Sequence, residues 1–431
     1  MEFDYKNILI WGYGKSGRAV ENVLKDINVP YKIYDKKIKV NGGNYIYKLS
    51  ARVLKQFDLI VLSPAVSIYD KYVKLAEQLG IKVIGELEFG FWFTSADVIA
   101  VTGTNGKTTT VRLINEALKT AGYKSGAYGN IGEPLTIAYK VDLDYIVCEV
   151  SSFQLETTDR FAPYVSVLLN VDKDHLDRHK TVENYIELKK SLFKNCDNSD
   201  CVVLNMADKN CEKISGEIAG SQTNFNTKNG FEIKNNTLYY KGEKTVEINE
   251  KLLNYTYSDN ILAVACVLKS FNLDLEILNK IELNEPCVPH RLEVFKKFNG
   301  VTYIDDSKAT NPHATLKAVE TLNGNIVLLL GGLNKDFNFN ELISKLPHNV
   351  TKIITFGKSG KKINKICKKY NIMTYNVKWL HNVKNILHNV INVGDTVLFS
   401  PACASFDEFY GYDKRGEYFK KVVNEMVGDN E

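Results

Sequence analysis

A glycine-rich loop joins an apolar strand to a helix in the stretch IAVTGTNGKTTTVRL, residues 99–113. Gly103 and Gly106 allow backbone N–H groups to approach an oxyanion, and the helix N-terminus favours negative charge. Lys107 supplies a positive charge, and the hydroxyl of Thr108 can hold Mg²⁺. The pattern therefore predicts a site for nucleotide phosphates.

This loop is shorter than the usual phosphate-loop pattern. The full pattern needs another glycine at position 101, where this chain has Val101. The loop therefore predicts a class of nucleotide-binding enzyme whose phosphate loop lacks this first glycine.

Polar residues also follow two other apolar runs, YIVCEV and VSVLLN. Glu149 ends the first run, and a carboxylate at a strand end beside a phosphate loop commonly holds Mg²⁺. The second run leads into VDKDHLDRH, in which Asp172 and Asp174 alone could form a solvated face. His175 is the stronger candidate, either as a metal ligand or as a substrate contact.

The N-terminal stretch WGYGKSG has the spacing of a dinucleotide-binding loop. Gly12, Gly14 and Gly17 follow a predicted strand and precede a predicted helix, and Asp35 ends the next strand. A tight strand–helix turn without a ligand gives the same spacing. The glycines do not distinguish NAD from another diphosphate.

The C-terminal part carries PHRLE, IDDSKATNP, GGLNKD and SPACASFDEFYGYDKRG. Arg291, Lys308 and Lys335 place one cation in each of three of these loops. Each alone could be a surface cation, but three at strand ends suit polyphosphates or carboxylates.

These loops are separated by alternating short strands and helical segments, which is the pattern of parallel α/β sheets. We predict three domains, at residues 1–93, 94–285 and 286–431, with an antiparallel hairpin appendage at about residues 220–250. Ligands of such sheets bind at the carboxyl ends of the strands, where the unusual residues fall.

The composition is that of an ordinary globular enzyme. The chain has 431 residues and a net charge of +4, without a basic run that would indicate nucleic-acid binding. Its eight cysteines form no CxxC pair, and no apolar run approaches the roughly 20 residues that span a bilayer. We expect a cytoplasmic, monomeric enzyme that contacts neither nucleic acid nor membrane.

The motifs TGTNGKTT, EVSSFQLE, NVDKDHLDRH followed by YIELKKSLF, PHRLE, DDSKATNP and SPACASFDEF occur together and in this order. The set resembles the Mur ligases, the ATP-dependent amide-forming ligases of cell-wall precursor synthesis. The resemblance covers nearly the whole chain, and the shortened loop is typical of this superfamily, which includes the folylpolyglutamate synthases. GELEF, GNIGEP, DSKATN and SPACASFDEF favour a member that adds D-glutamate over those that add alanine, a diamino acid or a dipeptide.

The resemblance implies an α/β fold of three domains: a Rossmann-like N-terminal domain for the UDP substrate, a central P-loop ATP-binding parallel sheet, and a C-terminal Rossmann-like α/β domain for the amino acid. The implied substrates are UDP-N-acetylmuramoyl-L-alanine, D-glutamate and ATP, with two Mg²⁺ sites.

Site residues follow from the same resemblance. The implied catalytic residues are Lys107, His175 and Lys189. The implied ATP-binding residues are Gly103, Thr104, Asn105, Gly106, Lys107, Thr108, Thr109, Asn260, Arg291 and Asp306. The implied metal ligands are Thr108, Glu149, His175 and Lys189. The implied UDP-substrate contacts are Lys15, Ser16, Asp35, Lys36, Ser63, Asn130, Ser151, Ser152 and Gln154. The implied D-glutamate contacts are Lys308, Thr310, Lys335, Ser405, Phe406 and Tyr412.

The family also carries a carbamylated lysine four residues after the tyrosine of a YxxxK motif. Tyr185 therefore selects Lys189, with Lys190 as the neighbouring competitor. One position departs from the family: Tyr257 replaces the first Asn of His-Asn-x-x-Asn and leaves Asn260.

Three alternatives remain at this stage. A related ligase or a folylpolyglutamate synthase would share the phosphate loop but differ in the first domain and in the SPACAS loop. An NAD-dependent oxidoreductase would explain GYGKSG but leave TGTNGKTT without a role. A non-catalytic nucleotide-binding regulator would not need His175 and Lys189 together.

Overall fold

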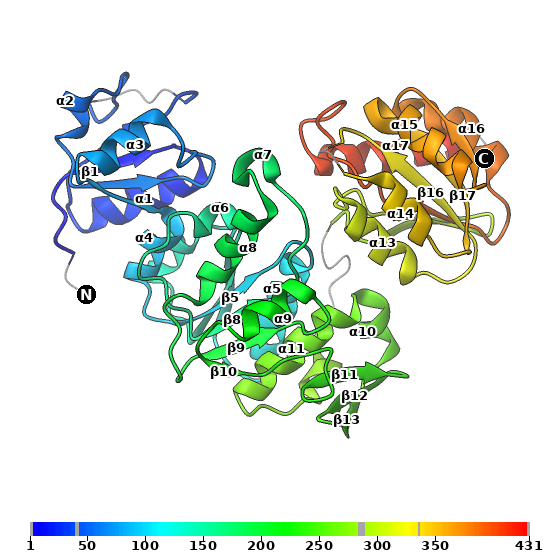
Figure 1. The fold of residues 1–431 in the computed structure, drawn as a ribbon, viewed down its shortest axis with the longest axis horizontal. Helices are drawn as coiled ribbons and strands as arrows, with labels where there is room; N and C mark the ends of the chain where they lie inside the picture. The colour runs from blue at the N-terminus through cyan, green and yellow to red at the C-terminus, as the bar shows by residue number, and fades with distance from the viewer. Residues whose placement is uncertain (1–2, 39–42, 283–288, 335–336, 429–431) are drawn as a thin grey trace. The chain divides into compact units, whose positions relative to one another are not determined.

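The structure is a computed structural model that describes residues 3–38, 43–282, 289–334 and 337–428. The chain divides into two compact units, Met1–Glu282 and Leu283–Glu431. Figure 1 shows the α/β elements from the N-terminus in blue to the C-terminus in red. The predicted α/β class is confirmed.

The first unit begins with a four-stranded parallel sheet in the order β2-β1-β3-β4. The central pair of strands is buried at every position, because strands flank both and helices cover the faces. The strands are β1 (Ile8–Trp11), β2 (Tyr31–Tyr34), β3 (Leu59–Leu62) and β4 (Lys82–Gly85). The helices are α1 (Lys15–Asp26), α2 (Ala51–Leu54), α3 (Lys71–Gln78) and α4 (Glu86–Phe93).

A six-stranded parallel sheet follows in the order β10-β9-β8-β5-β7-β6. Its strands are β5 (Asp97–Thr102), β6 (Ser125–Gly129), β7 (Tyr145–Glu149), β8 (Val165–Leu168), β9 (Cys201–Leu204) and β10 (Ser221–Gln222). Its helices are α5 (Lys107–Thr120), η1 (Leu135–Lys140), α6 (Ser152–Leu155), α7 (Leu176–His179), α8 (Val182–Lys190), η2 (Ser191–Phe193), α9 (Lys209–Ser215), α10 (Glu250–Tyr255), α11 (Ser258–Ser270) and α12 (Ile277–Lys280). Because β5 lies between β7 and β8, the loop after β5 lies where strand order reverses, a position at which open α/β sheets bind ligands.

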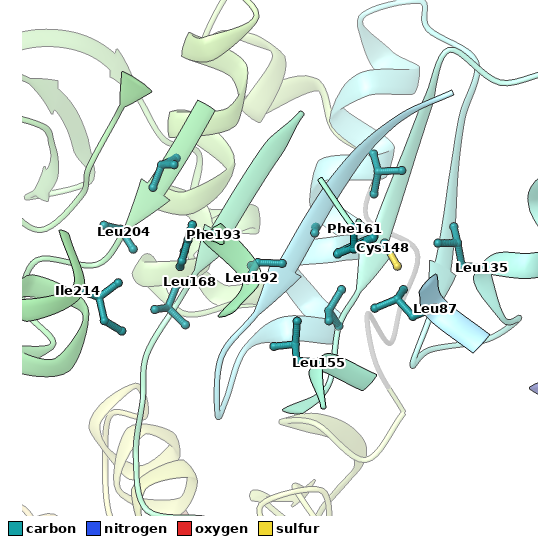
Figure 2. Packing of buried hydrophobic residues seen from close by; sticks show 14 of the residues in the cluster. Leu87, Leu135, Cys148, Leu155, Phe161, Leu168, Leu192, Phe193, Leu204 and Ile214 are labelled. Carbon is teal, nitrogen blue, oxygen red and sulfur yellow. The ribbon is translucent and has the colours of Figure 1, made fainter. Parts of the chain in front are cut away.

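The core of this sheet is shown in Figure 2. Cys148 of β7, Leu168 of β8 and Leu204 of β9 belong to one buried cluster with Leu192 and Phe193 of η2. Leu87 of α4 and Leu135 of η1 belong to the same cluster, so α4 is packed into the central core.

The predicted appendage is antiparallel, as expected, but has three strands. They are β11 (Phe231–Lys234), β12 (Thr237–Tyr240) and β13 (Glu243–Glu247). Tight turns join them, so the chain folds back twice over a short stretch.

The second unit holds a six-stranded mixed sheet in the order β14-β15-β19-β16-β17-β18, in which only β14 runs antiparallel to its neighbour. Its strands are β14 (Glu293–Phe298), β15 (Val301–Asp305), β16 (Ile326–Gly331), β17 (Val350–Phe356), β18 (Met373–Asn376) and β19 (Thr396–Phe399). Its helices are α13 (Pro312–Glu320), α14 (Phe339–Lys345), α15 (Gly357–Lys369), η3 (Leu380–Val383), α16 (Lys384–Val390) and α17 (Tyr412–Gly428). Among the described residues, no helix is both long enough and apolar enough to cross a membrane.

Candidate functional site

The glycine loop turns sharply from β5 into α5. Gly103 and Gly106 have φ values of 155° and 88°, a region that favours glycine. A Cβ at Gly106 would lie 2.6 Å from Oδ1 of Asn260, so a side chain there would also collide. Nζ of Lys107 donates to the carbonyl oxygens of Gly103 (2.7 Å) and Thr104 (2.9 Å). The lysine charge therefore lies over the loop, as phosphate binding requires.

Asn170 fastens this loop to the end of β8. Its Oδ1 accepts from the N–H of Asn105 at 2.8 Å, and its Nδ2 donates to the carbonyl of Asn105 at 3.1 Å. Thr104 donates its N–H to the carbonyl of Asn170 at 3.0 Å. Asn170 was not among the predicted site residues, although its place at the end of the apolar run VSVLLN marks it as a strand-end polar residue.

Glu149 lies beside the loop and is 3% exposed. Its Oε2 accepts from Oγ1 of Thr108 at 2.7 Å, and its Oε1 accepts from Nδ2 of Asn130 at 2.8 Å. The structure thus brings together three predicted residues from α5, β7 and the loop after β6. A hydroxyl and a carboxylate oxygen at a phosphate loop are the ligand types that Mg²⁺ prefers.

Lys189 is buried beneath the same loop and is 1% exposed. Its Nζ donates to the carbonyl of Gly103 at 3.0 Å and to Oγ1 of Thr102 at 3.3 Å, and it lies 4.8 Å from the ring centre of Tyr185. Burial, and then the charge of Lys107, hold the pKa of Lys189 well below its usual value. The low pKa favours a neutral amine at this position.

Lys190 lies on a different face of α8. Its Nζ forms an ion pair with Glu217. Among the described contacts, neither side chain of this pair touches the glycine loop. The helical register therefore separates the two neighbouring lysines as the YxxxK spacing predicts.

His175 precedes the four-residue helix α7 and has a left-handed backbone, with φ of 51°. Its Nε2 lies 3.6 Å from Oδ2 of Asp174, and its ring stands edge-on to Phe153 at 4.9 Å. The side chain is 36% exposed, so the imidazole remains accessible to a ligand.

Asn260 supports the loop from α11. Its Oδ1 accepts from Oγ1 of Thr110 at 3.1 Å, and its Nδ2 donates to Oγ1 of Thr256 at 2.8 Å. Thr109 is 7% exposed in the first turn of α5, and Tyr257 is the residue before α11. The described contacts of the Asn260 amide are therefore structural ones beneath the phosphate loop.

The predicted UDP-binding residues of the first sheet lie in the loops after β1, β2 and β3. Asp35 accepts from the backbone N–H groups of Tyr13 (2.7 Å) and Lys37 (2.6 Å). Burial would raise the pKa of Asp35, but these donors and the N–H of Ile38 hold it below its usual value. Oγ of Ser63 donates to the carbonyl of Gly12 at 2.8 Å, which ties two of the loops together.

The remaining contacts in this region lie nearer the surface. Lys36 pairs with Asp70 at 2.7 Å, and Nζ of Lys15 lies 3.3 Å from the carbonyl of Gly132. Ser16 is half-buried in the first turn of α1.

Ser151, Ser152 and Gln154 lie at the start of α6. Ser151 and Gln154 cap each other, with Oε1 of Gln154 2.9 Å from the N–H of Ser151. Oγ of Ser152 shares a 2.9 Å hydrogen bond with Nε2 of His179. These hydrogen bonds within the protein hold the three side chains in place.

In the second unit, Arg291 and Asp306 form a pair, with Nη1 3.2 Å from Oδ1. Oγ of Ser400 donates to the other oxygen of Asp306 at 2.7 Å. Burial raises the pKa of Asp306 to about 6, although the Arg291 charge opposes this shift.

The predicted D-glutamate residues that the structure describes follow β15 and β19, which are neighbours in the sheet. Lys308 lies 5.5 Å from the ring centre of Tyr412. Thr310 is half-buried, Ser405 is buried and Phe406 is 65% exposed. Lys335 lies outside the described residues.

Comparison with known proteins gives a consistent result. Residues 101–268 match the Mur ligase middle domain, and residues 290–403 match the "Mur ligase, glutamate ligase domain". A UDP-N-acetylmuramoylalanine--D-glutamate ligase of Thermoanaerobacter sp. (strain X514) is 35% identical over 99% of this chain and 100% of its own length. The enzyme of the same name from Natranaerobius thermophilus is 36% identical over 96% of this chain and 91% of its own.

Solved structures show the same fold at lower identity. The UDP-N-acetylmuramate-alanine ligase of Thermotoga maritima is 18% identical, with a TM-score of 0.62 over 98% of this chain and 99% of that chain. The MurF ligase of Thermotoga maritima in complex with ADP is 18% identical, with a TM-score of 0.62 over 99% of this chain and 96% of that chain. At this identity the likeness supports the three-domain fold alone.

Proposed function

Because this chain belongs to the Mur ligase family, we propose that it joins D-glutamate to UDP-N-acetylmuramoyl-L-alanine, with cleavage of ATP to ADP and phosphate. The observation that carries this proposal is the convergence of Lys107, Thr108, Glu149 and Lys189 around one glycine loop. The reaction belongs to the synthesis of peptidoglycan precursors, and we place the enzyme in the cytoplasm as a monomer.

The chemistry explains why so many charged groups converge. A carboxylate is a poor acyl donor, so an oxygen of the alanyl carboxylate attacks the γ-phosphorus of ATP, ADP leaves and an acyl phosphate forms. The amine of D-glutamate then attacks the carbonyl carbon, a proton is lost and phosphate leaves as the amide bond forms. The reactants are all anionic, so fixed cations such as Lys107 lower their mutual repulsion.

The oxygen ligands beside the loop fit Mg²⁺. We assign Thr108 and Glu149 to one ion, and His175 with a carbamylated Lys189 to a second. Bound Mg²⁺ would neutralise phosphate charge and orient the transferred group. The protein itself fixes these donors: Asn130 holds one oxygen of Glu149, and the short helix after His175 holds that residue in place.

The carbamate proposal rests on the burial of Lys189. A neutral amine reacts with CO₂ to form a carbamate, which reverses the charge of the side chain. The low pKa of Lys189 favours the reactive neutral form, and Lys190 is paired with Glu217 instead.

We further propose that the three predicted domains divide the substrates, with the UDP part in residues 1–93, ATP in residues 94–285 and D-glutamate in residues 286–431. The candidate UDP contacts are Lys15, Ser16, Asp35, Lys36, Ser63, Asn130, Ser151, Ser152 and Gln154. The candidate ATP contacts are the glycine-loop residues and Asn260, together with Arg291 and Asp306 from the third domain. The candidate D-glutamate contacts are Lys308, Thr310, Lys335, Ser405, Phe406 and Tyr412.

Phosphate release from ATP tests the proposal directly. We expect release only when UDP-N-acetylmuramoyl-L-alanine and D-glutamate are both present, with L-glutamate and diaminopimelate poor substitutes. Omission of either reactant is the control for uncoupled hydrolysis of ATP. Equal turnover with L-alanine or with a diamino acid would refute the assignment to D-glutamate.

A further inference from the structure

Glu156 is a buried carboxylate that the proposed reaction does not use. Its side chain is 1% exposed, and it lies between Arg178 and His179. Nε of Arg178 lies 3.0 Å and 3.1 Å from its two oxygens, and Nη2 adds a close ion pair. Burial alone would raise the pKa of Glu156, but His179 and Arg178 hold it below its usual value. The carboxylate is therefore charged and directs the guanidinium.

The other N–H groups of Arg178 reach the loop after β3. Nη1 donates to the carbonyl of Pro64 at 3.1 Å, and Nη2 donates to the carbonyl of Val66 at 3.0 Å. Ser63 begins this loop and is bonded to Gly12 in the loop after β1. A guanidinium presents several donors in one rigid plane, whereas a lysine ammonium is a single point. A lysine would have to contact the carboxylate and both carbonyls through one nitrogen atom, so it could not reproduce the separate bonds of Nε, Nη1 and Nη2.

Arg178 also belongs to the short helix that presents His175. The ring of Phe153 touches both residues, 4.3 Å from the Arg178 guanidinium and 4.9 Å from the His175 ring. His179, at the end of the helix, is bonded to Ser152. A helix of four residues is not stable by itself, so these side-chain contacts must hold it.

We propose that Arg178, directed by Glu156, is a positioning residue that locks residues 63–66 of the substrate loop to the helix carrying His175. The proposal rests on the proposed function, in which Ser63 of this loop contacts the UDP-linked substrate and His175 holds a Mg²⁺ ion. The lock fixes the spacing between these two contacts. It explains why Arg178, paired with Glu156, also donates to carbonyl oxygens more than a hundred residues away in sequence.

Two variants test the lock. Arg178→Lys keeps the charge opposite Glu156 but cannot reach both carbonyl groups. The double variant Glu156→Gln/Arg178→Met removes both charges, so no unpaired buried charge is left to unfold the protein. Arg52→Lys, at an exposed arginine of α2, is the matched control.

We expect both test variants to raise the KM for UDP-N-acetylmuramoyl-L-alanine about tenfold and to lower kcat, because small misplacements of bound groups cost rates of this order or more. The KM for ATP should stay within about twofold, since the glycine loop is not touched. A merely destabilised protein would instead show a smaller active fraction with unchanged KM values.

Hydrogen exchange of the amides of residues 63–70, measured without substrate, supplies a second readout. We expect faster exchange in both test variants and no change in Arg52→Lys. Unchanged exchange and an unchanged acceptor KM would overturn the lock, as would an equal rise of the ATP KM. If wild-type protein does not turn over the acceptor, the proposed function is wrong, and the exchange rates alone decide whether Arg178 holds the loop.

Discussion

Replacement of Lys189 by alanine tests the least common feature of the central site. Lys107 and Lys189 donate to the same carbonyl oxygen, that of Gly103, at 2.7 Å and 3.0 Å. Two ammonium groups so arranged lie within about 6 Å and would repel by about 3 kcal/mol at an effective dielectric constant of about 20. Burial disfavours a charged Lys189 further, so the neutral amine that reacts with CO₂ is favoured.

We expect Lys189→Ala to lower kcat by about 10²- to 10³-fold, the usual loss when one preorganised electrostatic group is removed from a site. Lys190→Ala is the matched control, because Lys190 pairs with Glu217 at the surface and such ion pairs contribute little. Its kcat should stay within about twofold of wild type. Acetate or propionate should partly restore Lys189→Ala by supplying a carboxylate in the vacated space.

The assay is phosphate release with and without added acid, followed by carbon-13 NMR of protein equilibrated with labelled CO₂. Wild type and Lys190→Ala should carry a labelled carbamate that Lys189→Ala lacks. An active Lys189→Ala variant, or a wild-type protein without label, would show that the reasoning from burial and repulsion is wrong.

Three other predictions concern single residues. Lys107→Ala should abolish turnover but leave binding of the UDP-linked substrate largely intact by calorimetry, because we assign the UDP part to the loops of the first sheet and Lys107 follows β5 of the next; loss of both would contradict this. Thr108→Val should raise the Mg²⁺ concentration for half-maximal turnover about tenfold, whereas Thr120→Val at the end of the same helix should not. The protonated form of Asp306 stabilises the fold below about pH 4, and this contribution is lost as the pH rises through its folded pKa of about 6. Asp306→Asn should therefore raise the free energy of unfolding at pH 8 by up to about 3 kcal/mol and change it little at pH 3.5. Thermal unfolding of both proteins over this pH range measures the two differences. An equal effect of the substitution at the two pH values would refute the prediction.

The sequence predicted most of the strands and the loops that follow them. Apolar runs such as YIVCEV and VSVLLN are long and bounded by polar residues, so β7 and β8 could be placed with their ends. The helix from Lys107 was predicted from apolar residues that recur at helical spacing, and it is α5. The local sequence pattern is sufficient to predict such strands and helices, because residues close together in sequence determine them.

The contacts that fix these loops could not be predicted in this way. The bonds from Arg178 to Pro64 and Val66 join residues whose pairing depends on how two sheets pack. The left-handed backbone of His175 is not indicated by its residue type, because the energy of that conformation comes from the contacts of α7. Such features arise from tertiary packing, which a single sequence does not encode in a local pattern.

The order of strands has a consequence for how the chain folds as it is synthesised. The first sheet is complete at Gly85, so a nascent chain can close it before the next strands have left the ribosome. β5 must wait for its two neighbours, β7 from Tyr145 and β8 from Val165, and the glycine loop gains its support from Asn260 later still. A ribosome that stalls between these points would display a finished first sheet joined to an open, apolar β5. Chaperones and proteases would therefore meet this chain chiefly through its central sheet.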